Sequence, residues 1–357
     1  MSLKKRLGPF IVFILTATLA YLLFAPVPIT PSAWTPPPAP GLTGQYERNS
    51  RLSTVQRLSL GEGHKPEDVA LDGDGKIYAG FEDGRIMVLQ PDGTQPRVFA
   101  NTGGRPLGLI FDRNGNLIVA DAIKGLLSIG KTGDIRVLAV EADGEKFGCL
   151  NDLDVGADGT IYFTEASHKF PMSRHVEDLL EHQPNGRLLA LDPQTQRPRT
   201  LLRDLYFANG VAVSPDQTFV LVAETGKYRI RRYWLKEPRM GQTDIFIDNL
   251  PGFPDGVSSN GKDKFWLALV TPRQTLVDRM LPYPFVRKIV CRLPAFLRPG
   301  PERYSFVLAM DSNGHVVDNL QNGSPDCYSQ IANVVERNGT LYFGSIGEDT
   351  LGRFSLR

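Results

Sequence analysis

The sequence predicts an all-β fold, a six-bladed β-propeller, with an N-terminal transmembrane helix and short helical insertions. The main observation is a repeat that recurs roughly every 40 to 50 residues: an apolar strand, a turn of Asp, Asn and Gly, and a second β-branched or aromatic strand. The 35 glycines and 27 prolines among 357 residues suit the tight turns of such a fold. An uncharged apolar run before the repeats predicts the membrane helix.

The N-terminal run comes first. Lys4, Lys5 and Arg6 precede residues 8–25, GPFIVFILTATLAYLLFA, which carry no charge. A membrane-spanning helix needs about 20 apolar residues, so we expect residues 1–25 to form a cytoplasmic basic tip and an anchor. The basic cluster then places the rest of the chain on the non-cytoplasmic side, periplasmic in a bacterium or lumenal or extracellular in a eukaryote. A cleaved signal peptide is the alternative, although its apolar region is normally shorter and an A-x-A cleavage site is missing.

The composition of residues 26–50 predicts a Pro-rich linker, because the prolines of PVPITPSAWTPPPAPG favour an extended and semi-rigid chain. We expect it to hold the propeller, residues 51–357, off the membrane. The repeat units begin at Pro66, Arg105, Asn151, Phe207, Phe253 and Tyr328. The strand VQRLSL, residues 55–60, precedes the first unit and is expected to supply the outer strand of the last blade, which leaves no free sheet edge.

An oxygen-bearing side chain stands at the head of the first strand in four units: Glu67, Asn151, Asn209 and Asp255. The first strand of every propeller blade lines the central channel, so we expect these four side chains to converge on the axis. Two carboxylates and two amides form an all-oxygen set, which suits Ca²⁺ and does not suit zinc. In the alternative interpretation, each residue only caps a turn before its strand.

Composition excludes other classes. Lys and Arg number 40 and Asp and Glu number 39, so no nucleic-acid partner is expected. Cys149, Cys291 and Cys327 lack metal-binding spacing, and their odd number argues against a disulfide scaffold.

Several phrases carry a resemblance to a known family. PEDVALD, NGVAVSPD, PDGV, PNGRLLALDP and VAETGKYRIRRYWLK resemble the strictosidine synthase-like family, within the superfamily that includes gluconolactonase (senescence marker protein) and paraoxonase. The likeness is greatest to the branch of adipocyte plasma membrane-associated proteins and their bacterial relatives, which also carry an N-terminal anchor. The resemblance implies that Glu67, Asn151, Asn209 and Asp255 hold a catalytic calcium. It also implies that Asp152 is either a ligand of a second, structural calcium or a support for Asn151.

Two positions depart from the family pattern. The glutamate with which strictosidine synthase deprotonates its amine is replaced by Ala332, so amine-condensing chemistry is not expected. The histidine of the paraoxonase second inner strand is replaced by Leu107, so a paraoxonase-type histidine dyad is not expected either.

A calcium ion with an open position polarises an ester, lactone or phosphoryl oxygen, and the protein must then supply a base or nucleophile. We expect Asp255 in that role, with Glu67 mainly holding the metal. His168, in TEASHKF, is a candidate proton carrier, and His64 is a second one near Glu67. Both also fit ordinary loop histidines.

The remaining histidines, His175, His182 and His315, are interpreted as surface residues. Cys149 is interpreted as a buried core residue and not as a nucleophile.

Two insertions interrupt the repeat: SHKFPMSRHVEDLLEHQPNG in the third unit and TPRQTLVDRMLPYPFVRKIVCRLPAFLRPGPERY after Val270. The second predicts one or two basic amphipathic helices. Two interpretations stay open for it: a lid or a second contact with anionic lipid, or plain packing on the propeller flank.

The sequence therefore predicts a membrane-anchored, calcium-dependent hydrolase of small-molecule carboxylic esters or lactones, of arylesterase or lactonase type. A non-catalytic, calcium-stabilised propeller that serves as a binding scaffold is the first alternative. A strictosidine synthase-type enzyme that forms C–C bonds is the second.

Overall fold

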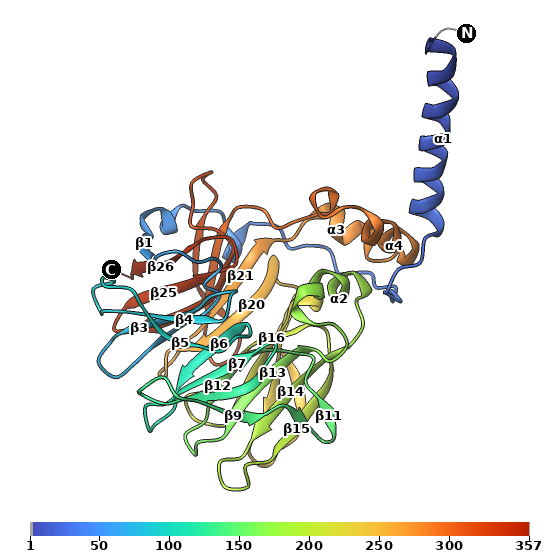
Figure 1. Ribbon diagram of the computed structural model, residues 1–357. Helices are drawn as coiled ribbons and strands as arrows, with labels where there is room; N and C mark the ends of the chain where they lie inside the picture. The colour runs from blue at the N-terminus through green and yellow to red at the C-terminus, as the bar shows by residue number, and fades with distance from the viewer. Residues whose placement is uncertain (1–2, 357) are drawn as a thin grey trace.

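The computed structural model describes residues 3–356, with side chains from residue 9 onward. Within this range the strands form six four-stranded antiparallel sheets arranged as a ring, plus one two-stranded hairpin (Figure 1). The six-bladed β-propeller expected from the repeat is confirmed, and each predicted unit supplies the inner strand of one blade.

The blades are described from the axis outward. The first blade contains β2 (Val69–Leu71), β3 (Ile77–Gly80), β4 (Arg85–Leu89) and β5 (Arg97–Asn101). The second contains β6 (Pro106–Phe111), β7 (Leu117–Asp121), β8 (Gly125–Ile129) and β9 (Ile135–Ala139). The third contains β12 (Cys149–Val155), β13 (Ile161–Ser167), β14 (Gly186–Leu191) and β15 (Pro198–Leu205). The fourth blade contains β16 (Ala208–Val213), β17 (Phe219–Glu224), β18 (Arg229–Trp234) and β19 (Thr243–Ile247). The fifth contains β20 (Gly252–Ser259), β21 (Phe265–Pro272), β22 (Ser305–Met310) and β23 (Val316–Asn322). The separate hairpin is formed by β10 (Glu141–Ala142) and β11 (Glu145–Lys146).

The sixth blade closes the ring. It contains β24 (Ile331–Arg337), β25 (Thr340–Ser345), β26 (Thr350–Ser355) and, as its outer strand, β1 (Gln56–Ser59) from the start of the propeller. Strand β1 pairs antiparallel with β26, and Leu58 lies opposite Leu351. The outer strand expected from residues 55–60 is therefore found where the sequence predicted it, and it covers a sheet edge that would otherwise be open to other chains.

The core lies between neighbouring blades, where apolar sheet faces meet. Between the fourth and fifth blades, for example, the rings of Phe219, Phe246 and Phe265 pack against one another with centroids 5.8–6.1 Å apart. This burial of apolar surface, worth about 25 cal/mol per Å², holds each blade to the next and thereby fixes the inner strands around the axis.

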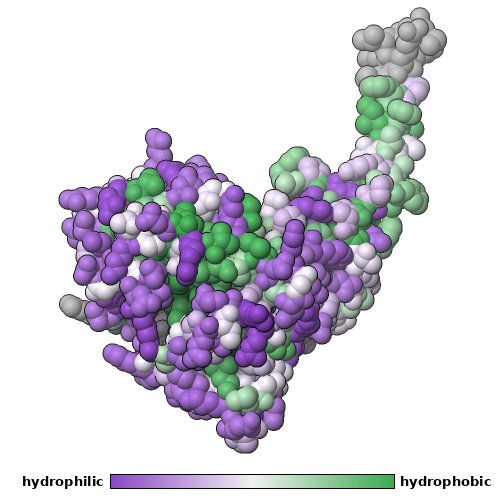
Figure 2. All heavy atoms as spheres, turned by 60° about the horizontal axis from the view of Figure 1, so that its bottom comes forward, coloured by the Kyte–Doolittle hydropathy of each residue, from purple (hydrophilic) through white to green (hydrophobic). Residues whose placement is uncertain are grey.

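Helix α1 (Leu3–Phe24) projects away from the ring, and the side chains described on it are mostly exposed and apolar (Figure 2). Within the part of the chain whose side chains are described, no helix is both long enough and apolar enough to cross a membrane. Residues 1–25 were expected to form a basic tip and an anchor. Met1 and Ser2 of this tip, and the side chains of Lys4, Lys5 and Arg6, lie outside the described residues.

The linker that follows α1 does not stand clear of the propeller. Ile29 is 3% exposed and packs with Leu180 and Met280, and the Trp34 ring stacks on His182 with centroids 4.6 Å apart. Arg273 donates a hydrogen bond to the carbonyl of Pro37. Much of the linker is therefore docked on the protein, which adds contacts that the sequence pattern alone did not predict.

Three helices from the two insertions stand over one end of the ring, and we call them the helical roof: α2 (His175–Glu181), α3 (Thr275–Met280) and α4 (Pro284–Arg292). Arg287 of α4 is fully buried and donates to the carbonyls of Leu180 and Ser32. The roof is thus tied to the linker as well as to the propeller. Figure 1 shows it between the base of α1 and the blades.

The closing strand generates a prediction. Leu58→Ala removes a side chain that is 3% exposed and packs with Leu351 and Leu60, so the free energy of unfolding should fall by about 2–5 kcal/mol, measured by denaturant titration. Its neighbour Ser59 is exposed, and Ser59→Ala is the matched control, expected to change stability by less than about 0.5 kcal/mol. Equal effects for the two variants would contradict the role of β1 in closure.

Candidate functional site

One side chain from each blade faces the propeller axis. A cavity of about 10 Å³ lies there, and its lining includes one residue near the start of each inner strand: Glu67, Leu107, Asn151, Asn209, Asp255 and Ala332. In the second to sixth blades this residue lies at an irregularity in the pairing between inner strand and next strand. Such β-bulges re-aim a side chain away from the sheet face. The bulge is therefore the local device that turns these residues toward the axis.

Glycine next to an axial residue lets the strands come this close. A Cβ on Gly210 would lie 2.3 Å from the backbone nitrogen of Val257, and a Cβ on Gly256 would lie 2.6 Å from the carbonyl of Ala332. The Asn209-Gly210 and Asp255-Gly256 pairs are therefore not hairpin turns. In each, the first residue faces the axis and the glycine makes room for the inner strand of the next blade.

The structure brings the four predicted ligands together. Glu67, Asn151, Asn209 and Asp255 come from four different blades, are each 5–7% exposed, and line the same small cavity. A cavity of this size holds a single water molecule or ion. Among the described residues there is no cluster of three or more His, Cys, Asp and Glu arranged to hold a metal. The axial set is of a different kind, with two carboxylates and two amides, and its oxygen donors fit Ca²⁺.

The electrostatics of Asp255 point the same way. Burial is the main cause that raises its pKa well above the usual value, and repulsion by Glu67 and Asp152 adds to it, while a hydrogen bond from Asn209 acts in the opposite sense. No backbone N–H in the described part of the chain donates to the Asp255 side chain. Burial thus disfavours the charged form of Asp255, and a cation bound at the axis would stabilise that form.

Arg105 was not identified from the sequence. Its guanidinium is buried and donates to Glu67 at 2.8 Å and to the carbonyl of Lys65 at 3.2 Å, while its backbone N–H donates to Asp121. One oxygen of Glu67 therefore already faces a cation. The sequence signal was available, because Arg105 lies two residues before the axial position of its blade, as Lys65 does in the first blade.

A second set of buried carboxylates joins the inner strands. Asp68 accepts hydrogen bonds from Val69 and Leu109, and Asp152 accepts from Leu153 and Val211, so each links its own strand to the inner strand of the next blade. Burial raises the pKa of Asp68 to about 7 and that of Asp152 well above its usual value. Because both oxygens of Asp152 accept backbone N–H groups, its observed contacts are those of a support for the inner strands.

The orientation of Asn209 is fixed by a short chain of hydrogen bonds. Its Nδ2 donates to Thr225 Oγ1 at 3.1 Å, and that hydroxyl donates to the carbonyl of Pro254 at 2.7 Å. Engagement of the nitrogen with Thr225 leaves the amide oxygen as the atom available to a ligand on the axis.

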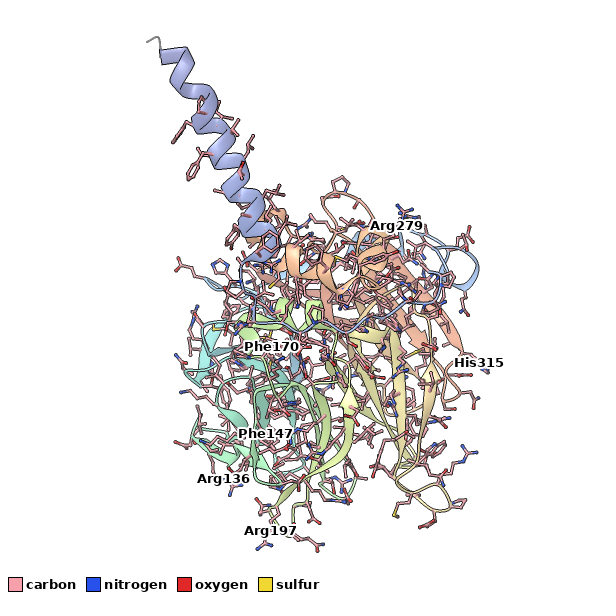
Figure 3. All side chains as sticks on the ribbon, turned by 90° about the vertical axis from the view of Figure 1, so that its right-hand side faces the viewer. Arg136, Phe147, Phe170, Arg197, Arg279 and His315 are labelled. Atoms are coloured by element: carbon pink, nitrogen blue, oxygen red, sulfur yellow. The ribbon has the colours of Figure 1, made fainter. Side chains whose placement is uncertain are left out.

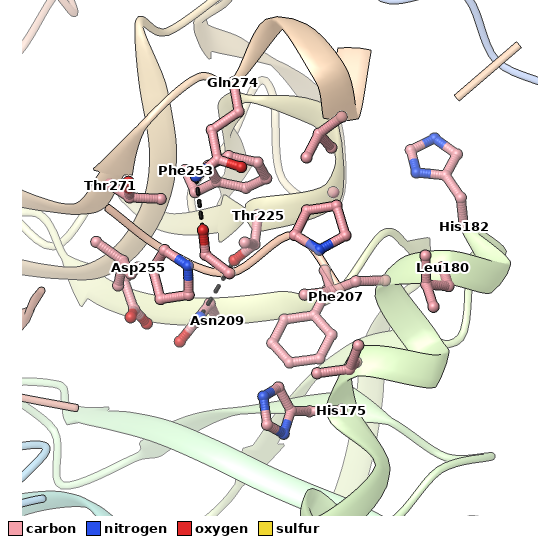
Figure 4. A pocket seen from close by; sticks show the side chains of 18 of the residues that line it. His175, Leu180, His182, Phe207, Asn209, Thr225, Phe253, Asp255, Thr271 and Gln274 are labelled. Carbon is pink, nitrogen blue, oxygen red and sulfur yellow. Dashed lines mark hydrogen bonds between the residues drawn. The ribbon is translucent and has the colours of Figure 1, made fainter. Parts of the chain in front are cut away.

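A larger cavity of about 240 Å³ lies between the axis and the helical roof, and the four predicted ligands form part of its lining. Its walls are mostly apolar, and they are built from propeller loops and from both insertions: Met172, Val176, Leu179, Leu180, Phe207, Phe253, Val270, Val277, Met280, Leu281 and Val290. Figure 4 shows Asn209 and Asp255 at the base of this cavity, with Phe207 and Phe253 beside them. The arrangement places a polar floor under apolar walls.

The histidines differ from expectation. His168 is not part of the cavity lining, and its Nδ1 contacts the carbonyl of Asn185 at 2.7 Å; His64 is exposed and contacts Asp349, not Glu67. His175 and His182, expected at the surface, both line the cavity instead. His182 is 4% exposed, and burial together with Lys227 and Arg287 lowers its pKa to about 3. Sequence reasoning did not identify these two histidines as cavity residues, because it did not predict that the first insertion covers the channel.

Two further interpretations agree with the structure. His315 is exposed on the flank of the propeller, as Figure 3 shows. Cys149 is 2% exposed and packs with Leu107 and Phe207, and burial raises the pKa of its thiol. It is a core residue, because the raised pKa favours the thiol over the reactive thiolate and no base contacts it among the described residues.

Comparison with known proteins gives consistent results. The family profile described as strictosidine synthase matches residues 151–238, and the strictosidine synthase-like N-terminal profile matches residues 44–89. Protein strictosidine synthase-like 4 of Arabidopsis thaliana is 36% identical over 85% of this chain and 83% of its own length. Adipocyte plasma membrane-associated protein of Bos taurus is 32% identical over 94% of this chain and 86% of its own length.

Solved structures share the fold at low identity. A gluconolactonase from Xanthomonas campestris superposes with a TM-score of 0.62 at 18% identity, covering 93% of this chain and 99% of that one. Regucalcin from Agrobacterium tumefaciens, described as a calcium-binding protein, gives a TM-score of 0.60 at 14% identity over 84% of this chain and 93% of that one.

The close approach of the inner strands can be tested. Gly210→Ala should lower the free energy of unfolding by about 1–3 kcal/mol, because the added Cβ meets the backbone of the next blade. Gly73→Ala is the control, since its Cβ meets nothing within 4 Å. Denaturant midpoints for the two variants measure the difference. Equal midpoints would show that the blades are not packed as described.

Proposed function

Because the chain belongs to the strictosidine synthase-like family, we propose that it is a membrane-anchored, calcium-dependent hydrolase of carboxylic esters or lactones. The observation that carries this proposal is the axial set of four oxygen-bearing side chains at the base of an apolar cavity. Shared fold with a gluconolactonase and with regucalcin adds support at the level of architecture.

Glu67, Asn151, Asn209 and Asp255 are proposed as the calcium ligands. Ca²⁺ takes six to eight oxygen ligands, so four protein side chains leave positions for water and substrate. Bound there, calcium supplies a Lewis acid that polarises the carbonyl oxygen of an ester or lactone.

Asp255 is proposed to take the proton from the attacking water at its carboxylate. Asp255 suits this role because it is a buried carboxylate that lines both the axial cavity and the large cavity above it. Arg105 holds Glu67 in position through its guanidinium. His175 is better placed than His168 as a further proton carrier, because it lines the cavity and its Nδ1 is occupied by the carbonyl of Met172, which leaves Nε2 to face a substrate.

The walls favour an apolar substrate. Phe207 and Phe253 stand beside the axial residues, and Leu180 and Met280 of the roof line the same cavity. Such walls bind an acyl or aryl group and exclude water from the reacting carbonyl, which strengthens the electrostatic interactions at the axis.

The membrane anchor is proposed from residues 8–25, which carry no charge. Support comes from the exposed apolar side chains of α1, which include Phe10, Phe13 and Leu15 at 60–70% exposure. The bovine relative is named plasma membrane-associated. The basic residues before the helix favour a propeller on the non-cytoplasmic side.

One observation favours the alternative of a non-catalytic scaffold. The Arg105 guanidinium already pairs with Glu67, so a protein cation stabilises part of the charge that a metal ion would otherwise stabilise. Amine condensation of strictosidine synthase type is disfavoured, because Ala332 is the residue that faces the axis in the sixth blade.

Catalysis is tested with phenyl acetate and a panel of lactones. Asp255→Asn should lower kcat/KM at least about 100-fold, as expected for loss of a general base, and a chelator should abolish turnover of the unmodified chain. Glu302→Gln, an exposed residue outside the cavity, is the control. A folded, calcium-binding chain without turnover on any of these substrates would support the scaffold instead.

The electrostatics give a prediction on stability. A carboxyl whose pKa is raised by folding makes the folded state bind more protons, so stability falls as pH rises from the unfolded pKa, near 4, through the folded value. In chelator, Asp255→Asn should therefore gain stability relative to the unmodified chain as the pH rises above about 4.

Calcium should reverse this order, because the chain that keeps the Asp255 carboxylate binds calcium more tightly and is stabilised more by it. Thermal unfolding midpoints at several pH values measure both effects. A difference between the two chains that is independent of pH and of calcium would contradict the proposed site.

A further inference from the structure

The outer surface of the second insertion exposes large apolar side chains beside the base of α1. We call this surface the lipid face, and it is formed by α3, α4 and η5 (Ala295–Leu297), with exposed fractions of 54–84% for Leu276, Tyr283, Phe285, Phe296 and Leu297. A scattered exposed apolar residue needs no explanation, but several in one short segment mark an interaction site.

The lipid face is fixed to the end of α1. Arg292 of α4 donates from Nε to the carbonyl of Ala25 at 2.7 Å and from Nη1 to the carbonyl of Leu22 at 2.8 Å. Arg287, buried in the same helix, binds the linker carbonyl of Ser32. These contacts tie α4 to the final turn of α1 and to the linker, so the roof does not move freely relative to α1.

The segment is also basic. Residues 274–299 contain five Arg and Lys and a single acidic residue, Asp278, which pairs with Arg273. Arg279 and Lys288 form no ion pair within the described part of the chain. Figure 3 shows Arg279 at the end of the molecule from which α1 rises. Exposed aromatic and aliphatic side chains interspersed with cations are the composition of helices that lie on anionic bilayers.

We propose that the lipid face lies on the surface of an anionic bilayer next to α1, as a second membrane contact. This rests on the anchor of the proposed function, because α1 brings α4 to the membrane surface. The inner side of the same segment lines the large cavity through Val277, Met280 and Val290. Docking therefore places the cavity about one helix diameter, roughly 10 Å, from the lipid.

The test uses the full chain in vesicles with 70% phosphatidylcholine and 30% phosphatidylglycerol. Phe296→Cys carries an environment-sensitive nitrobenzoxadiazole label, and Val317→Cys on the propeller flank is the control, since Val317 is also exposed. The three native cysteines are buried, and an identically treated unmodified chain measures any labelling of them. Vesicles with brominated acyl chains should reduce emission at position 296 at least about twofold and leave position 317 unchanged.

The charge is tested in the same assay. Arg279→Glu with Lys288→Glu should return emission at position 296 toward the control value, whereas Arg136→Glu with Arg197→Glu, at the opposite end of the molecule in Figure 3, should not. Equal quenching in pure phosphatidylcholine overturns the preference for an anionic bilayer. No quenching at position 296 in a chain that floats with the vesicles overturns the lipid face and leaves the anchor intact. A chain that does not float with vesicles overturns both. Neither result depends on hydrolysis.

Discussion

Burial of carboxylates on the propeller axis is the constraint on which the candidate site depends. Removing a carboxylate from water costs several kcal/mol unless partners stabilise the charge. Asp68 and Asp152 find theirs in backbone N–H groups of the inner strands. Asp255 has only Asn209 beside it, and Glu67 has Arg105. Among the described residues, Asp255 is therefore the axial carboxylate whose charged form is stabilised least, and it lies on the floor of the large cavity.

The repeated units made much of this predictable. The spacing of the units predicted the six blades and the closing strand. The residue at the head of an inner strand could be assigned to the axis, because a propeller brings the starts of all inner strands together whatever segments lie between them. Asn209 could be placed on the axis because it stands at the head of the first strand of its unit, and the first strands of all blades line the channel. The calcium ligands themselves stay a prediction, because an oxygen-bearing side chain on an axis does not by itself identify an ion.

The insertions were outside the reach of this reasoning. A repeat fixes where its own strands lie, but a segment between strands is placed by tertiary contacts far away in sequence. Arg287 illustrates the point: it looks like a solvated cation in a basic amphipathic helix, yet it is fully buried and binds carbonyls of α2 and of the linker. The positions of His175, His182 and the linker follow from that packing, and no local pattern encodes it.

The residues beside Glu67 set the character of this axis. Leu107 and Ala332 occupy the axial positions of the two blades that flank the first blade, so no polar neighbour on either side shares the charge of Glu67. Arg105 fills that role from the rim of the second blade. The polar half of the axis is then formed by Asn151, Asn209 and Asp255 from three consecutive blades. The axial ring is therefore asymmetric, with the ion pair of Glu67 and Arg105 on one side and the oxygen-bearing side chains of Asn151, Asn209 and Asp255 on the other.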